Sequence, residues 1–250
     1  YGHVVVDEAQ ELSAMQWRLL IRRCPSRSMT VVGDLAQAGS PAAPLTWADV
    51  FDRVAPGRWS VQPLTVNYRT PAPMMELAAR VLKASGSPVT APSSVRDGSA
   101  PSVIHVPSAT HPGEAGAGHP ITPAAALSAA AAERIAGWAE MEGRTAVITP
   151  RSLHESVSHG LAGNLPSGTL GAGSAALEAP VSVLTVAEAK GLEFDQVVLI
   201  EPGAILAESA RGGHDLYVAL TRATQELLVL HSGDLPAGFA VVVPDADPGT

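Results

Sequence analysis

Charged and amide side chains follow several short apolar runs of the sequence. Two adjacent carboxylates, Asp7 and Glu8, suit a magnesium nucleotide, because one can hold Mg²⁺ through water and its neighbour can orient or deprotonate an attacking water. Arginines from other segments, such as Arg69 and Arg222, can neutralise charge on a transferring phosphoryl group. These residue types are therefore compatible with a phosphoryl-transfer site. The other residues of this kind that follow such runs are Gly33, Asp34, Gln37, Tyr68, Lys190, Gly191 and Glu193.

Each residue taken singly also has an ordinary structural explanation. An Asp-Glu pair at the end of a strand more often caps a helix or is solvated, and a lone arginine in a helix more often forms an ion pair. Asp34 could equally be structural, tying its loop to a neighbouring backbone. The functional interpretation therefore depends on the order and spacing of the segments.

The apolar runs predict buried strands, separated by helical patterns. They are short, continuous and rich in Val and Ile, which is typical of parallel sheets. The alternation predicts an α/β fold, in which ligands bind at the carboxyl ends of the strands. The expected strands are Val4–Val6, Met29–Val32, Val61–Val66, Val103–Val106, Thr145–Thr149, Val181–Thr185, Val197–Ile200 and Leu227–His231. The expected helices are Ala14–Arg23, Trp47–Val54, Ala72–Ala84, Ala124–Met141, Leu153–Leu161 and Asp215–Ala223.

Composition limits the class of protein. The 250 residues carry 16 Lys plus Arg against 24 Asp plus Glu, a net charge of −8, so the basic face typical of nucleic-acid binding is not evident. No apolar run reaches the ~18 residues of a membrane span, and no signal-peptide pattern opens the sequence. The single cysteine, Cys24, excludes an internal disulfide and favours a cytoplasmic setting. The eight histidines lack the spacing of a metal site.

Five segments, in order, resemble the motifs of UvrD/Rep-like superfamily 1 helicases. The resemblance implies two RecA-like parallel-sheet domains, the first of them incomplete. The segments are Val4-Val5-Val6-Asp7-Glu8-Ala9-Gln10 (Walker B), Val32-Gly33-Asp34-Leu35-Ala36-Gln37, Asn67-Tyr68-Arg69-Thr70, Thr185 through Glu193, and Tyr217 through Ala223.

The resemblance also implies a role for each matching residue. Asp7 would hold Mg²⁺ and Glu8 would activate the water, while Gln37 would sense the γ-phosphate. Arg69 would reach the γ-phosphate, and Arg222 would be an arginine finger from the second domain. The implied ATP-binding residues are Gly33, Asp34, Tyr68 (stacked on adenine), Lys190, Gly191 and Glu193 (on the ribose).

Composition shifts suggest the domain limits. Residues 1–88 would be the rear part of the first RecA-like domain, and residues 89–101, within a stretch rich in Ser and Pro, would be a linker. Residues 102–235 would form the second domain and residues 236–250 a tail.

The sequence departs from the family in several places. The Gly-x-x-x-x-Gly-Lys-Ser/Thr phosphate loop is absent, and in the family it precedes the Walker B strand. We therefore expect a fragment of a longer chain that is inactive alone. The stretch after Gln37 is poor in the aromatic residues that stack on single-stranded DNA, and Ala187 replaces a frequent histidine. The departures point to a branch of the family. Four segments together resemble the HelD-type proteins, which bind RNA polymerase: Gly33 through Gln37, Trp47 through Val50, Leu64 through Pro71, and Val186 through Gly191.

Two functional hypotheses remain, with a third that is not enzymatic. The first is an ATP-dependent DNA helicase or translocase that uses Mg²⁺ with ATP and binds DNA. The second is an RNA-polymerase-binding release factor that unwinds nothing. The third is a non-catalytic remnant that binds only partner proteins. Arg151 and Thr185 are weaker candidates for nucleic-acid contacts, since they end strands that relatives use for this purpose.

Overall fold

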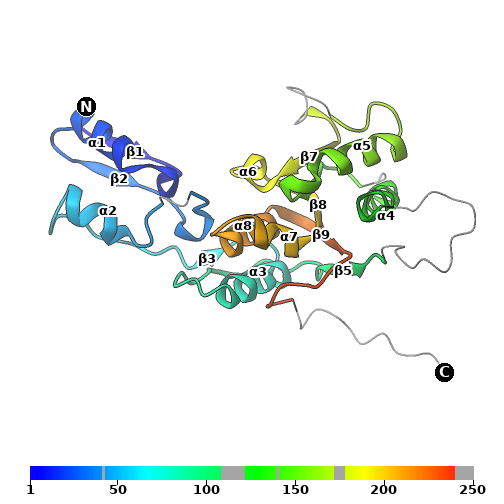
Figure 1. The fold of residues 1–250 in the computed structure, drawn as a ribbon. Coiled ribbons are helices and arrows are strands. Elements are labelled where there is room, and N and C mark those ends of the chain that lie inside the picture. The colour runs from blue at the N-terminus through cyan, green and yellow to red at the C-terminus, as the bar shows by residue number, and fades with distance from the viewer. Residues whose placement is uncertain (41–42, 108–121, 139–140, 172–177, 240–250) are drawn as a thin grey trace, which may run out of the picture.

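A five-stranded parallel sheet organises the larger part of the chain (Figure 1). The computed structural model describes residues 1–40, 43–107, 122–138, 141–171 and 178–239. The strand order is β5-β9-β8-β6-β7, so the last strand in sequence, β9, lies between β5 and β8. The strands are β5 (Ser102–His105), β6 (Thr145–Thr149), β7 (Val181–Thr185), β8 (Phe194–Ile200) and β9 (Ala223–His231).

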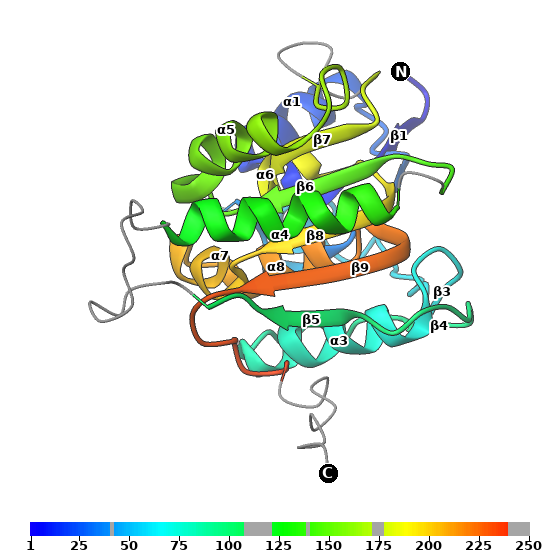
Figure 2. The ribbon, with the colours of Figure 1, turned by 90° about the vertical axis from the view of Figure 1, so that its right-hand side faces the viewer.

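Helices cover both faces of this sheet, as its continuous apolar strands require. Helices α4 (Pro123–Gly137) and α5 (His154–Asn164) pack on one face, through Leu127 and Leu161 against Val147 and Val198. Figure 2 shows the sheet with α4 in front of it. The other face packs against α3 (Ala72–Ala84) and α8 (Gly212–Leu220), with α7 (Pro202–Glu208) beside α8. The short α6 (Val186–Ala189) follows β7, and the 3₁₀ turn η3 (Arg151–Leu153) precedes α5.

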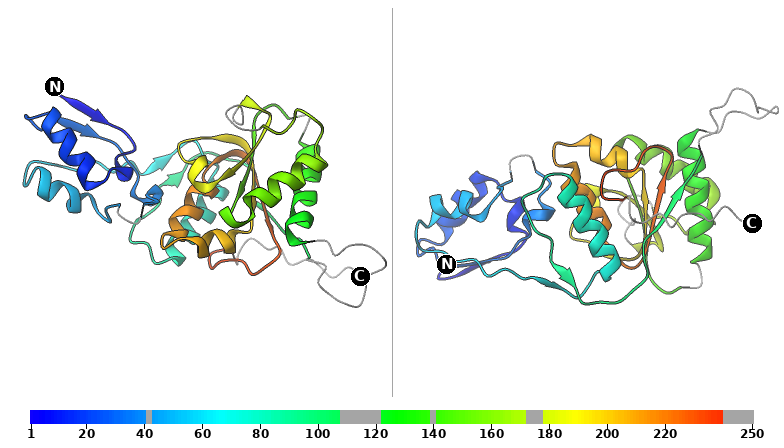
Figure 3. Two further views of the ribbon diagram at one scale, coloured as in Figure 1. Left: turned by 45° about the horizontal axis from the view of Figure 1, so that its top comes forward. Right: turned by 90° about the horizontal axis from the view of Figure 1, so that it is seen from below.

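A smaller unit precedes the sheet and lies to one side of it (Figure 3). Its two parallel strands, β1 (Val4–Val6) and β2 (Met29–Val31), pair in register. Helices α1 (Ala14–Arg23) and α2 (Trp47–Val54) pack with them around Trp17 and Phe51. A capping box formed by Ser13 and Gln16 begins α1. Two 3₁₀ turns, η1 (Ala9–Glu11) and η2 (Leu35–Gln37), follow the strands and carry candidate site residues.

Helix α3 belongs to the core of the large sheet. Met74, Leu77 and Leu82 are buried in one cluster with Leu199 and Leu216. The chain therefore contributes this helix to the core before the expected linker begins, although the domain limits themselves stay a prediction. Within the linker, β4 (Ser93–Ser94) pairs with β3 (Val66–Asn67).

The structure corrects two expected elements. The strand expected at Val61–Val66 forms only at Val66–Asn67, and Val61 and Leu64 are exposed, because no neighbouring strand pairs with residues 61–65 among the described residues. The last helix ends at Leu220 instead of Ala223, and β9 begins at Ala223. Arg222 therefore lies in the turn between helix and strand.

No helix in the described parts of the chain is long and apolar enough to cross a bilayer.

The buried core predicts that shortening a side chain of β8 lowers the stability of the fold strongly. Leu199→Ala should lower the free energy of unfolding by about 3 kcal/mol, because Leu199 is fully buried and its loss leaves a cavity. Leu64→Ala is the control, since Leu64 is 84% exposed, and it should change stability by no more than about 0.5 kcal/mol. Urea unfolding measures both, and equal effects would contradict the assignment of the core.

Candidate functional site

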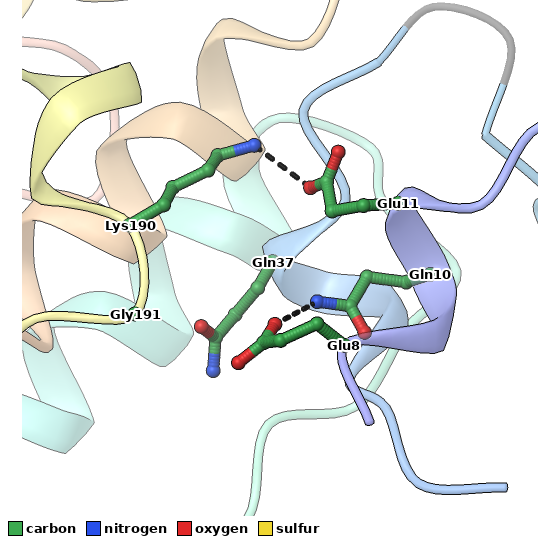
Figure 4. Close-up of a pocket in the computed structure, with 6 residues that line it drawn as sticks. All are labelled: Glu8, Gln10, Glu11, Gln37, Lys190 and Gly191. Atoms are coloured by element: carbon green, nitrogen blue, oxygen red, sulfur yellow. Dashed lines mark hydrogen bonds and ion pairs between the residues drawn. The ribbon is translucent and has the colours of Figure 1, made fainter. Parts of the chain in front are cut away.

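The two units of the chain meet around a hollow of about 140 Å³ (Figure 4). Residues of η1 and η2 line one side of it, and the loop after α6 lines the other. The lining residues are Glu8, Gln10, Glu11, Gln37, Lys190 and Gly191. A groove of about 1310 Å³ shares Glu8 and Gln37 with this hollow, and Asp7, Gly33, Asp34, Tyr68 and Arg69 also line it. Seven candidate residues from β1, β2 and β3 and the turns after them therefore line the groove or the hollow.

The two expected catalytic carboxylates are exposed at the end of β1. Asp7 accepts a hydrogen bond from the backbone N–H of Glu8 at 2.8 Å. Glu8 has a φ of 50° in the left-handed region, an uncommon conformation for a residue with a side chain. Its carboxylate accepts a hydrogen bond from Gln10 Nε2 at 2.6 Å (Figure 4). The turn thus directs Glu8 toward Gln37 and the hollow.

Gln10 connects the ends of β1 and β2. It is buried, and its Oε1 accepts a hydrogen bond from the backbone N–H of Asp34 at 3.0 Å. Gly33 makes this approach possible, because a Cβ there would lie 2.6 Å from Gln10 Oε1 and 2.9 Å from the Trp47 ring. The glycine is therefore required by packing at this point.

Asp34 orients Gln37. One carboxylate oxygen accepts a hydrogen bond from the Ala36 N–H at 2.8 Å, and the other accepts one from Gln37 Nε2 at 3.0 Å. These contacts cap η2 and leave Gln37 Oε1 free to accept from the second unit. The contacts of Asp34 in this structure are structural.

Arg222 is the buried partner of Gln37. Its guanidinium donates to Gln37 Oε1 at 3.1 Å and to the carbonyl of Leu192 at 3.0 Å, and its Nε donates to the carbonyl of Val218 at 3.1 Å. The side chain is 5% exposed, and burial lowers the pKa of Arg222, an effect that the nearby Glu193 opposes. Burial of this kind is tolerated only because the guanidinium donors find acceptors. Asp34, Gln37 and Arg222 thus form one chain of polar contacts between the units.

Arg69 forms an ion pair with Glu193 at 2.6 Å between Nη1 and Oε1. The two side chains are 52% and 40% exposed, so both can be reached from solvent. The side chain of Asn67 shapes this turn by accepting hydrogen bonds from the N–H groups of Arg69 and Thr70 at 2.7 and 3.0 Å. Tyr68 is 76% exposed and lines the large groove.

Lys190 contacts the first unit. Its Nζ lies 2.9 Å from Glu11 Oε1, and both residues line the hollow (Figure 4). Gly191 follows with a φ of 71°, which favours glycine and reverses the chain direction. The loop then continues to Leu192 and Glu193, which meet Arg222 and Arg69.

The two weaker nucleic-acid candidates, Arg151 and Thr185, line neither the hollow nor the groove. Carboxylates of the same chain accept hydrogen bonds from both residues. Glu208 accepts hydrogen bonds from the N–H groups of Arg151 and Ser152 at 2.8 and 2.9 Å. Glu188 accepts from the N–H and hydroxyl of Thr185 at 2.8 and 2.7 Å. The hydrogen bonds from Thr185 lower the pKa of Glu188. The backbone N–H groups of Arg151 and Ser152, and the N–H and hydroxyl of Thr185, therefore already have carboxylate partners.

Sequence reasoning missed the roles of Gln10 and Glu11. Both directly follow the carboxylate pair, in Asp7-Glu8-Ala9-Gln10-Glu11. Their proximity in sequence was visible, but their partners, Asp34 and Lys190, lie far along the chain.

The exposed carboxylate of Asp7, at the end of β1, fits a nucleotide-bound Mg²⁺. Among the described residues, no group of three His, Cys, Asp or Glu side chains could hold a metal ion alone. An exposed carboxylate at a strand end still suits Mg²⁺, because this ion keeps several waters and uses substrate phosphates as ligands. Asp7 meets that requirement.

A parallel sheet covered by helices on both faces, with polar residues gathered at strand ends, defines a doubly wound α/β domain. Residues 180–230 match the family model of the UvrD-like helicase C-terminal domain, so this part of the chain is helicase-like. The matched segment contains β8, the loop Lys190–Glu193 and Arg222.

Among the solved structures that are similar to this chain, one helicase domain supports the α/β fold. The C-terminal domain of a possible DNA helicase from Lactobacillus plantarum WCFS1 has a TM-score of 0.50 and 21% identity, covering 71% of this chain and 94% of its own. The arterivirus nonstructural protein 10 helicase, alone and in complex with DNA, gives TM-scores of 0.47 and 0.49 at 17% identity; each match covers 97% of this chain but only 41% and 42% of the helicase. No curated protein matches the chain.

The three hydrogen bonds of the buried Arg222 guanidinium predict that even replacement by lysine destabilises the protein. Arg222→Lys should lower the free energy of unfolding by about 1–3 kcal/mol, because an ammonium cannot reach the three acceptors that the guanidinium bonds. Arg69→Lys is the matched control, and it should cost less than about 1 kcal/mol because its ion pair is exposed. Urea unfolding of both variants makes the comparison, and an Arg222→Lys variant as stable as the control would contradict the assigned contacts.

The lowered pKa of Glu188 predicts a pH-dependent contribution to stability. A carboxyl whose pKa is lower in the folded state stabilises the fold above its ordinary value of 4.5, and this contribution is lost as the pH falls through the folded-state value. Glu188→Gln should therefore destabilise the protein at neutral pH and converge with the parent in acid. Unfolding curves from about pH 7 to about pH 3 measure this. A difference that does not vary with pH would exclude the ionised carboxylate as the cause.

Proposed function

We propose that this chain is part of an ATP-dependent nucleic-acid motor of the UvrD/Rep type, hydrolysing ATP between two RecA-like domains. The observation that carries the proposal is the polar chain Asp34–Gln37–Arg222 beside Glu8 and the Arg69–Glu193 pair. It brings Glu8 and Asp34 of the first unit close to Arg222 of the second, and Arg69 into contact with Glu193. A nucleotide between them would connect closure of the two units to hydrolysis.

Each residue has a proposed role in this reaction. Glu8 would take a proton from the attacking water, since its exposed carboxylate faces the hollow. Arg69 would exchange Glu193 for a phosphate oxygen, and Glu193 would then be available to a ribose hydroxyl. Tyr68 would stack on the base, and Gln37 would report the state of the phosphates to Arg222 through their hydrogen bond.

Mg²⁺ held at Asp7 would supply charge neutralisation on the phosphates. The 250 residues contain no phosphate loop, so this reaction requires one from outside this sequence. That requirement determines the material for the test, which is the longest natural polypeptide containing these residues.

A second candidate function is an RNA-polymerase-binding release factor that uses the nucleotide to change shape and unwinds nothing. The observation that favours it is that Glu208 and Glu188 accept hydrogen bonds from the backbone N–H groups of Arg151 and Thr185, so carboxylates lie at the two strand ends proposed for DNA contacts. The net charge of −8 also supports it, because non-specific DNA binding depends on neutralising phosphates.

The Glu8→Gln variant tests the proposed chemistry. Hydrolysis of ATP by the complete polypeptide should fall by ~10²–10⁴-fold, because the amide cannot accept a proton, while fluorescent-nucleotide binding stays near the parent value. Glu133→Gln, an exposed carboxylate on α4, is the charge-matched control and should hydrolyse ATP normally. Unchanged turnover in Glu8→Gln would overturn the role of Glu8.

The same hydrolysis assay separates the two functions. It is run alone, with single-stranded DNA and with RNA polymerase. Strong stimulation by DNA supports the translocating motor. A response to polymerase with indifference to DNA supports the release factor, and no hydrolysis under any condition overturns both.

A further inference from the structure

One carboxylate oxygen joins three segments at the border of the two units. Glu11 Oε1 lies 2.9 Å from Lys190 Nζ and accepts a hydrogen bond from the Gly39 N–H at 3.2 Å. Glu11 ends η1, Gly39 follows η2, and Lys190 follows α6. The three segments that carry Glu8, Gln37 and Gly191 therefore share a single junction.

Glycine at position 39 makes this junction possible. A Cβ at Gly39 would overlap Lys190 Nζ. The ammonium thus lies directly against the backbone of the loop after η2, and a side chain at position 39 would displace it from this place.

The second unit holds the other side of the same loop. Arg211 donates to the carbonyls of Ala38 and Ala43 at 3.4 and 2.7 Å, and His214 Nδ1 lies 2.9 Å from the carbonyl of Ala36. The loop after η2 is therefore attached to α8 independently of η1. Glu11 connects η1 to this loop, through the Gly39 N–H, and to the second unit, through Lys190.

We propose that Glu11 and Lys190 are a positioning pair that fixes η1, and with it Glu8, relative to Gln37 and Arg222. Glu8 caps the same three-residue turn that Glu11 ends, so anchoring one end of the turn anchors the other. Lys190 acts through Glu11, since its ammonium faces that carboxylate and not the large groove. The claim that the pair aligns Glu8 for hydrolysis rests on the proposed function. The claim that the pair holds η1 against the second unit does not.

A distance measurement without nucleotide tests the mechanical part. Spin labels at Arg18→Cys on α1 and Ser156→Cys on α5, both exposed positions, report the separation of the units after Cys24→Ser removes the native thiol. The parent should give one narrow distance distribution, and Glu11→Gln and Lys190→Met should broaden it. The exchanged pair E11K/K190E should narrow it again, whereas Glu133→Gln should leave it unchanged.

Hydrolysis by the complete polypeptide tests the positioning part. In Glu11→Gln and Lys190→Met, kcat should fall by ~10–100-fold with KM changed by less than about twofold, because a displaced base misaligns the attack without removing a ligand. The exchanged pair should recover most of the loss. A loss of stability alone would not produce this split or its rescue.

The outcomes separate the two proposals. Unchanged distance distributions in both single variants overturn the positioning pair, whatever hydrolysis shows. Broadened distributions in both single variants, together with a parent polypeptide that hydrolyses no nucleotide, overturn the proposed function and support the contact. If a single variant does not fold, the exchanged pair decides, and a broad distribution there overturns the proposal.

Discussion

The arrangement of the site depends on the hydrogen bonds that the guanidinium of Arg222 donates. A buried cation is costly unless acceptors surround it. Here Val218 and Leu192 supply backbone carbonyls, and Gln37 supplies an amide oxygen from the other unit. The end of α8, the loop after α6 and the η2 turn are therefore held together by one side chain.

The loop Lys190–Glu193 extends the same organisation. Its successive residues meet Glu11, Arg222 and Arg69, and Gly191 provides the reversal that lets neighbouring side chains diverge. A nucleotide that displaced Glu193 from Arg69 would act on a loop already attached to both units. Under the proposed function, this loop would pass the state of the bound nucleotide to the relative position of the domains.

The strand ends away from this site have a different character. Glu188 and Glu208 accept hydrogen bonds from Thr185 and from the backbone N–H groups of Arg151 and Ser152, so carboxylates lie at this edge of the sheet. A surface of that kind binds phosphates weakly at physiological salt and is better suited to a protein partner. This is the physical reason why the polymerase-directed function remains a serious alternative to DNA translocation.

The sequence by itself determined the α/β class and most strands of the large sheet, because apolar periodicity is a local property. It also determined the motifs within residues 180–230, the segment that matches the helicase family model, because motif spacing is local as well. Tertiary structure decided the strand order β5-β9-β8-β6-β7 and the contacts of Arg222 with Gln37 and of Lys190 with Glu11, which join residues 185 and 179 positions apart. It also decided that Val61–Val66 would not form a full strand, since β-structure requires a neighbouring strand to accept its hydrogen bonds. Apolar character shows that a segment can be buried, but only the folded chain supplies the partner.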